Sequence, residues 1–318
     1  MTARGEGTAG MRSWGNSREL TKVSYGLVQA NPGMTRWTTR AVVHAGIVGG
    51  IGVLLGLGVA FAGLAVMDSN KGDDASPASL ALLAAGGVIV VLGLIAGLTA
   101  ANLQFAGLIS ATDDVLHGRP VDEQAAKAAA HARIRPLFAW STISIVVGAL
   151  VSLIRGDGDS GILVTIVRAL VAGLVAAVWA VVTALVLPVI VLERVGATKA
   201  IRRSASIIRS TWGEAVFGSV RIGARFGLRY TLPGVLLLIG GIVLAAVVGE
   251  AAIVPGLAVA FVGLVLMIIG AVKAATCRSV FGVALYRWAT GEGALGPFSD
   301  DDLRGAVETR TGRVPTPV

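Results

Sequence analysis

The chain has 318 residues, of which 54% are hydrophobic and 14% charged, and its mean hydropathy is +0.78. This composition excludes an ordinary soluble domain, because such a domain needs charged side chains to cover its surface. The net charge of +8 would suit a nucleic-acid-binding protein. However, the basic residues lie beside apolar runs, where membrane orientation and anionic lipid account for them, so we expect no nucleic-acid partner.

Six apolar runs are separated by charged segments, and each is long enough, or nearly so, to cross a hydrocarbon core roughly 30 Å thick as a helix. They do not alternate between apolar and polar residues, which favours helices over barrel strands. The predicted fold is an all-α, polytopic six-helix transmembrane bundle, built of three hairpins with cytoplasmic amphipathic helices. The predicted spans are residues 41–67, 78–109, 136–154, 161–192, 231–249 and 255–272.

The regions outside the spans differ in composition. Residues 1–15 are polar and glycine-rich, and residues 289–318 combine glycines, prolines and a run of aspartates. We predict a disordered N-terminus over 1–15, a six-span membrane domain over 16–288 and a mostly disordered cytoplasmic tail over 289–318.

An amphipathic or polar helix is predicted before each hairpin. The first covers residues 17–30 and stops at Asn31-Pro32-Gly33. The second follows a turn at residues 118–120 and begins at Asp122 and Glu123, since acidic residues suit the first turn of a helix. The third covers residues 198–212, with Ile201, Ala205, Ile208 and Trp212 expected on one apolar face.

The exits of the second and sixth spans share a weak pattern. Each apolar run continues as a helix beyond its predicted membrane end, reaches a turn containing Gly and Pro, and then meets an acidic helix start. This pattern indicates two long helices that leave the membrane on the same side and supports units of one hairpin each.

Lys and Arg are concentrated before the first span, in the second and fourth connections, and after the sixth span. The other three connections hold only Lys71 and Arg155, beside several acidic residues. Because basic residues flanking spans are retained on the cytoplasmic side, both termini are predicted to be cytoplasmic, in a multi-pass protein of the plasma (inner) membrane.

The most specific stretch is residues 186–214. It contains a span ending in Leu187-Pro188, then Glu193, the helix segment Ala200-Ile201-Arg202-Arg203-Ser204, and Thr211-Trp212-Gly213. This stretch resembles a family of uncharacterised bacterial six-span integral membrane proteins, and more distantly the membrane-spanning domain of some glycerophosphodiester phosphodiesterases. The resemblance implies an integral inner-membrane protein and no established reaction, and the soluble catalytic domain of the phosphodiesterases is missing from this sequence.

Two residues of this stretch are candidates for a hinge or an ion pair. Pro188 removes a backbone donor and is expected to kink the fourth helix near its inner end. Glu193 lies at the membrane edge, where it either pairs with an arginine of the following helices or is a solvated carboxylate.

A group of basic residues follows the fourth span, and each cation near a charged leaflet contributes about 1 kcal/mol. Either generic surface attraction or a defined lipid site would explain them. Arg221, Arg225 and Arg229 recur every four residues, but this ladder precedes the apolar run, which favours snorkelling over a voltage sensor. The candidate anionic-lipid contacts are Lys199, Arg202, Arg203, Arg209, Arg221, Arg225 and Arg229.

Polar residues inside the spans are few. Asn102 and Gln104 are expected to make interhelical hydrogen bonds rather than substrate contacts. Arg168 is about two turns from the outer connection and is expected to anchor there by snorkelling. Glycines such as Gly52 and Gly56 would permit close helix packing, whereas dimerisation through them remains an open alternative.

No motif supplies a reaction. A single Cys and three unclustered His residues predict no disulfide, metal site or cofactor. We therefore expect a non-enzymatic membrane protein that organises lipid or a membrane partner, with a homo-oligomer as one form of partner. The alternative is a transporter or permease-like component for a small solute or lipid, motivated by the proline in the fourth span.

Overall fold

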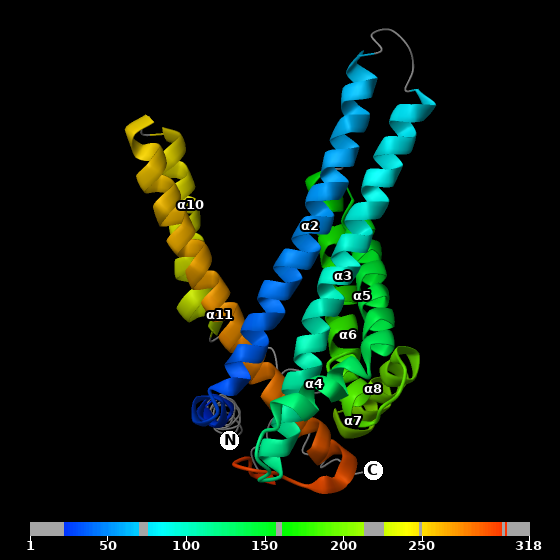
Figure 1. Ribbon diagram of the computed structural model, residues 1–318, viewed down its shortest axis with the longest axis vertical. Helices are drawn as coiled ribbons and strands as arrows, with labels where there is room; N and C mark the ends of the chain where they lie inside the picture. Colours follow the sequence, from blue (N-terminus) through cyan, green and yellow to red (C-terminus); the bar gives the residue numbers. More distant parts are fainter. Residues whose placement is uncertain are drawn as a thin grey trace, which may run out of the picture. The chain divides into compact units, whose positions relative to one another are not determined.

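The computed structural model describes residues 22–69, 76–156, 161–212, 226–247, 250–300 and 303, and these residues form helices and connections without strands. A first helix is described over residues 22–30. The elements that follow (Figure 1) are α2 (Gly33–Ser69), α3 (Pro77–Leu116), α4 (Glu123–His131), α5 (Ile134–Arg155), α6 (Ile162–Val182), α7 (Val186–Leu192), α8 (Ala197–Trp212), the π-helical turn η1 (Gly227–Thr231), α10 (Leu232–Val247), the 3-10 turn η2 (Glu250–Ala252), α11 (Ile253–Arg287) and the π-helical turn η3 (Trp288–Glu292).

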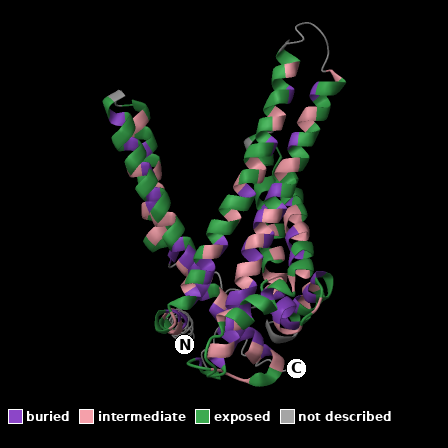
Figure 2. Cartoon of the chain, in the orientation of Figure 1, coloured by how far each residue is buried: buried purple, intermediate pink, exposed green. Residues whose placement is uncertain are grey.

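The all-α prediction with six candidate membrane spans is confirmed. The spans are Gly33–Asp68, Pro77–Leu116, Ile134–Arg155, Leu163–Leu192, Gly227–Val247 and Ile253–Glu292. Large apolar side chains on them are exposed, such as Phe61 at 72% and Leu163 at 76%. Figure 2 shows this exposed surface along the spans, as expected where the neighbour of a helix is lipid rather than water.

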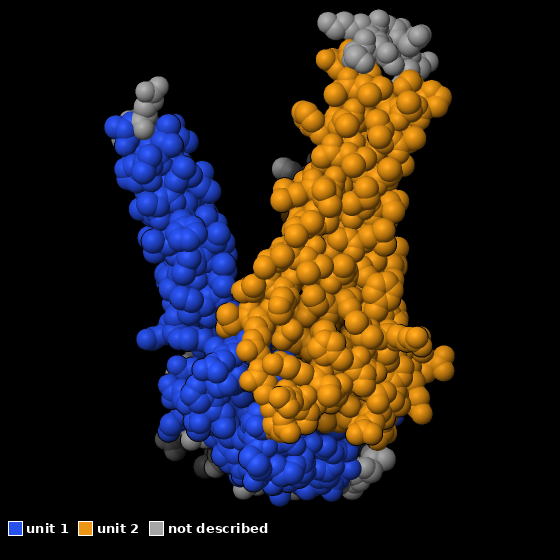
Figure 3. All heavy atoms as spheres, in the orientation of Figure 1, with its two compact units in different colours: residues 1–38, 111–121, 206–318 blue, residues 39–110, 122–205 orange. Residues whose placement is uncertain are grey.

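The chain divides into two compact units (Figure 3). Unit 1 comprises residues 1–38, 111–121 and 206–318, and unit 2 comprises residues 39–110 and 122–205. The predicted disordered segment 1–15, and residues 301–302 and 304–318 of the predicted tail, lie outside the described residues. The domain boundaries and the grouping of the spans into three repeated hairpins stay predictions.

In unit 2, α2 and α3 run side by side (Figure 1) because glycines let their backbones approach. A Cβ atom on Gly93 would lie 2.6 Å from the Cα of Gly52, and one on Gly56 would lie 2.6 Å from the carbonyl oxygen of Gly86. Such contacts are possible only without side chains, which is the small-residue packing expected between membrane helices. α5 and α6 also meet, and the rings of Trp140 and Trp179 stack at 6.0 Å.

The fourth span is not one continuous helix. It is interrupted at residues 183–185, between α6 and α7. Ser204 of α8 forms hydrogen bonds with the backbone at this interruption. The Ser204 hydroxyl donates to the Val182 carbonyl at 2.6 Å and accepts from the Leu185 N–H at 3.3 Å. Buried Ser204 therefore supplies partners to backbone groups that a continuous helix would have paired internally.

In unit 1, α10 and α11 pack through small residues. A Cβ on Gly263 would lie 2.5 Å from the carbonyl oxygen of Gly234, and one on Gly256 would lie 2.6 Å from that of Gly241. Buried residues become frequent in the C-terminal half of α11 (Figure 2), from Val272 onward. There the Thr276 hydroxyl lies 2.8 Å from the hydroxyl of Thr38. This half of α11 is the core of unit 1.

Candidate functional site

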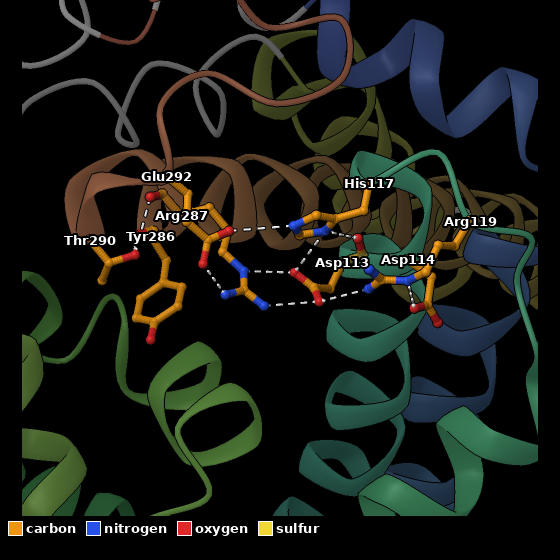
Figure 4. A network of polar contacts seen from close by, with 8 residues as sticks. All are labelled: Asp113, Asp114, His117, Arg119, Tyr286, Arg287, Thr290 and Glu292. Carbon is orange, nitrogen blue, oxygen red and sulfur yellow. Dashed lines mark hydrogen bonds and ion pairs between the residues drawn. The ribbon is translucent and has the colours of Figure 1, made fainter.

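The most developed polar cluster that the structure describes belongs to unit 1, at the ends of α3 and α11 (Figure 4). We call it the Asp113–Arg287 network. Its charged and titratable members are Asp113, Asp114, His117, Arg119, Arg287 and Glu292.

The turn that ends α3 brings together the four network residues at this end: Asp113, Asp114, His117 and Arg119. The Gly118 N–H donates to the Val115 carbonyl at 3.0 Å, and the Arg119 N–H donates to the Asp114 carbonyl at 2.8 Å. With Gly118 at φ 69°, these two bonds form a Schellman motif, which favours glycine at its left-handed position. The motif turns Arg119 back, and its Nε donates to Asp114 Oδ1 at 2.9 Å.

Asp113 and Arg287 form the centre of the network. Arg287 Nε donates to Asp113 Oδ1 at 2.7 Å, and Arg287 Nη2 donates to Asp113 Oδ2 at 2.9 Å. Their side chains are only 10% and 20% exposed, respectively. A two-point pair of this kind matches the planar guanidinium to the carboxylate and fixes its orientation.

Glu292 closes the network from the other side. Gly291 lies within η3 and has φ 92°, a conformation that residues with a side chain rarely adopt. At this residue the chain departs from helical geometry. Glu292 then accepts from Arg287 Nη1 at 2.5 Å, and its second oxygen lies 3.3 Å from His117 Nε2. His117 Nδ1 lies 2.7 Å from the Asp113 carbonyl oxygen, which can only accept, so Nδ1 carries the hydrogen. Protonating Nε2 would add a donor facing Glu292.

The network is built to hold two helix ends together. Three carboxylates face two guanidinium groups and one imidazole, and every one of these six side chains has a partner within it. Among the residues that the structure describes, no group of three or more His, Cys, Asp or Glu side chains is placed to hold a metal ion. The arrangement is that of a clasp between α3 and α11.

Sequence reasoning did not select this network. It treated the three histidines as unclustered and singled out neither Asp113 nor Arg287. The available signal was the pairing of Asp113 with His117 at i, i+4 directly after an apolar run, together with the similar exit of the sixth span. The structure joins these two exits, and their α-helices extend to Leu116 and Arg287, as the exit pattern predicted.

A second ionic cluster lies in unit 2, at the start of α4. Asp122 caps the helix by accepting from the N–H groups of Gln124 and Ala125 at 2.9 and 3.0 Å, which is the helix start expected from sequence. Glu123 accepts from Arg40 Nη1 at 2.6 Å and lies 3.0 Å from Lys127 Nζ. The hydrogen bond from Arg40 and then the Lys127 contact lower the pKa of Glu123 to about 2.

The predicted basic helix is present as α8, with Lys199, Arg202 and Arg209 exposed. Its buried face matches the predicted one only in part, and the side chain of Trp212, which belongs to the predicted face, lies outside the described residues. Ala200, Ser204 and Ile207 are buried together with Ala197 and Ile208, whereas Ile201 and Ala205 lie at the edge of that face. The buried face includes Ser204, whose hydroxyl bonds the backbone at the interruption of the fourth span. As a result, the apolar face of α8 packs on protein and its cations point outward.

Glu193 is paired in the way that one of the two sequence hypotheses required. Its Oε1 accepts from Arg203 Nε at 2.9 Å, across the turn between α7 and α8. Arg203 is therefore engaged with protein. Arg221 and Arg225 lie outside the described residues, and Arg229 is exposed within η1.

The remaining candidates lie within unit 2. Asn102 Nδ2 donates to Ser141 Oγ at 3.0 Å in a buried interhelical hydrogen bond between α3 and α5, while Gln104 is half-buried. Arg168 reaches back to the α5–α6 connection, since its Nη1 would lie 2.6 Å from a Cβ on Gly156. Pro188 is the third residue of α7, downstream of the interruption.

Comparison with protein families gives a match to a family of unknown function, DUF6159. Its model matches residues 84–296, which run from the first part of α3 to just beyond η3. No curated protein and no solved structure matches the chain. The distant likeness to the glycerophosphodiester phosphodiesterase membrane domain is not among these findings.

Proposed function

This chain belongs to DUF6159, a family of unknown function, and we propose from its own residues that it is a non-enzymatic protein that organises lipid or a partner in the bacterial inner membrane. The family and the six apolar helices make it a multi-pass membrane protein. The sequence has no motif that pairs a nucleophile with a base or cradles phosphate, so the proposal assigns no reaction to it.

The observation that carries the proposal is the anchoring of α8. Its apolar face and Ser204 are buried, which holds the helix on the bundle and leaves Lys199, Arg202 and Arg209 exposed. Cations fixed at the end of a span attract anionic head groups, at about 1 kcal/mol each. Arg203 is paired with Glu193, so the cations of α8 that we expect to contact lipid are Lys199, Arg202 and Arg209.

This proposal places both termini and α8 on the cytoplasmic side, supported by the distribution of Lys and Arg. Single cysteines at Ser76 and Ser206, introduced separately into a Cys277→Ser chain, test it in intact cells. An impermeant thiol reagent should modify the cysteine at 76 and not the one at 206. The opposite pattern would overturn the orientation.

Lipid selectivity tests the main claim. The full chain is reconstituted with spin-labelled phosphatidylglycerol or phosphatidylcholine, and the relative association of the two lipids is compared with that of the K199Q/R202Q/R209Q variant. We expect the preference for phosphatidylglycerol to fall toward equality in the variant and with added salt. An unchanged preference would contradict a lipid-organising role for α8. R203Q is a matched control, because that cation is paired with Glu193.

A transporter is the second candidate, favoured by the interrupted fourth span. Helix interruptions at membrane depth expose backbone groups that bind substrates in many transporters. Here, however, Ser204 already occupies the Val182 carbonyl and the Leu185 N–H. Saturable uptake of a labelled solute into proteoliposomes, lost in Asn102→Ala, would replace the first candidate with this one.

A further inference from the structure

We propose that a cavity in unit 1 binds one anionic phospholipid by its phosphate, with Lys273 of α11 as the cation. The proposal deepens the lipid role given above and rests on it, but it concerns a defined site with a fixed stoichiometry. None of its residues belongs to α8 or to the Asp113–Arg287 network.

The cavity lies between α11 and the segment of residues 25–35 and has a volume of about 170 Å³. A single water needs only about 15 Å³, so the space admits a phosphate with the adjoining glycerol. Val28 and Pro32 form apolar parts of the wall, and Gln29 and Thr35 add polar groups. Lys273 and the buried Cys277 line the α11 side, one turn apart.

The ammonium group of Lys273 has hydrogen-bond donors left for an anion. Its Nζ donates to the Tyr230 hydroxyl at 3.1 Å and lies 4.9 Å from the centre of that ring. An ammonium group has three donors, and no carboxylate within the described part of the chain forms a salt bridge with this one. A half-buried cation without an opposite charge is costly beside the hydrocarbon region, and a lipid phosphate would offset that cost.

The surroundings favour a lipid over a free ion. Lys273 is the first charged residue after the apolar stretch that begins α11, which is the depth at which lipid phosphates lie. The aromatic rings of Tyr25, Phe226 and Tyr230 follow one another at 6.3 and 6.4 Å, and aromatic residues of this kind gather at membrane interfaces. A small hydrated anion would gain nothing from Val28 and Pro32, whereas acyl chains could continue along exposed Ile268 and Ile269.

Native mass spectrometry of the full chain tests the site. Delipidated protein is titrated with phosphatidylglycerol, and separately with phosphatidylcholine. The wild type should take one phosphatidylglycerol with at least tenfold preference. Lys273→Gln should lose that preference, and Lys273→Arg should keep it. Arg278→Gln, which removes an exposed cation from the same helix, should bind as the wild type does.

Three results would overturn the proposal: equal binding by Lys273→Gln and the wild type, equal retention of both lipids by the wild type, or displacement of the bound lipid by millimolar inorganic phosphate. If Lys273→Gln does not fold, Val28→Trp fills the cavity while keeping the cation, and it should also lose the bound lipid. Retention of the lipid by Val28→Trp would contradict the site.

The α8 variant separates this site from the broader function. K199Q/R202Q/R209Q should keep the single tightly bound lipid even though its surrounding lipid preference falls. If the α8 variant behaves as the wild type in both measurements while Lys273→Gln loses its lipid, the lipid site at Lys273 is supported and the lipid-organising role of α8 is contradicted.

Discussion

Arg287 and Asp113 lie 174 positions apart in the chain and meet through two hydrogen bonds, of 2.7 and 2.9 Å. Asp113 follows the apolar part of α3, and Arg287 is the last residue of α11. The pair thus joins the C-terminal ends of two helices, beyond the apolar stretch of each.

Removing one partner of this pair should destabilise the protein. Asp113→Ala leaves the half-buried Arg287 with Glu292 alone, and losing one member of a buried pair costs about 3 kcal/mol. Thermal unfolding in detergent should show this loss, and Arg287→Lys should show a smaller one because the two-point geometry is lost but the charge is kept. Arg119→Gln is the control, since that guanidinium is 52% exposed and should contribute less than about 1 kcal/mol. Equal melting temperatures for all variants would contradict the clasp.

The lowered pKa of Glu123 predicts a pH dependence. Its folded-state pKa of about 2 lies below the ordinary value of 4.5, chiefly because of the Arg40 hydrogen bond. The stabilisation it provides is therefore fully present above about pH 4.5 and is lost as the pH falls toward 2. The melting-temperature difference between the wild type and Glu123→Gln should shrink over that interval. In Arg40→Gln, the carboxyl titration of Glu123 should move back toward its ordinary midpoint, and a midpoint that does not move would contradict the assigned cause.

The features that follow from apolar length and local chemistry could be read from the sequence. The six spans, the Asp122 helix start and the turn at Gly118 depend on residues close together in the chain or on composition alone. For Glu193, the sequence left pairing and solvation as two alternatives, and the structure shows the pairing. Pairings between distant segments could not be read, because periodicity says which residues share a face but not what that face meets. Arg287 with Asp113 is one case, and Lys273 beside Tyr25 and Tyr230 is another.

The fourth span shows how far a local rule reaches. Pro188 predicted a kink near the inner end of the fourth helix, and the helix is interrupted at residues 183–185, about one turn before the proline. At the third position of α7, Pro188 lacks an N–H that has no intrahelical partner in any helix. Ser204 is one small polar residue of a basic helix, and no local pattern predicts that its hydroxyl bonds a backbone carbonyl 22 positions away.

The close packing of α2 on α3 predicts that alanine substitutions at two glycines of α3 have different effects on stability. A Cβ on Gly93 would lie 2.6 Å from the Cα of Gly52, so Gly93→Ala must force the helices apart, at about 1–3 kcal/mol. Gly87, on the same helix, has nothing within 4 Å of the corresponding position. Gly87→Ala should therefore melt as the wild type does or slightly higher, because alanine favours helix. Equal melting temperatures for the two variants would contradict the backbone contact between α2 and α3 as the deciding factor.

We predict that Ser204, rather than Pro188, stabilises the interruption of the fourth span. Ser204→Ala removes the partner of the Val182 carbonyl and of the Leu185 N–H, and unpaired buried backbone groups should cost about 1–3 kcal/mol. Pro188→Ala should cost less than about 1 kcal/mol, because the position it occupies in α7 needs no donor. Ser206→Ala, on the exposed side of α8, is the matched control. Thermal unfolding compares the three variants in the same detergent. A large loss in Pro188→Ala with none in Ser204→Ala would show that the proline, rather than the serine of the neighbouring helix, holds the interruption in place.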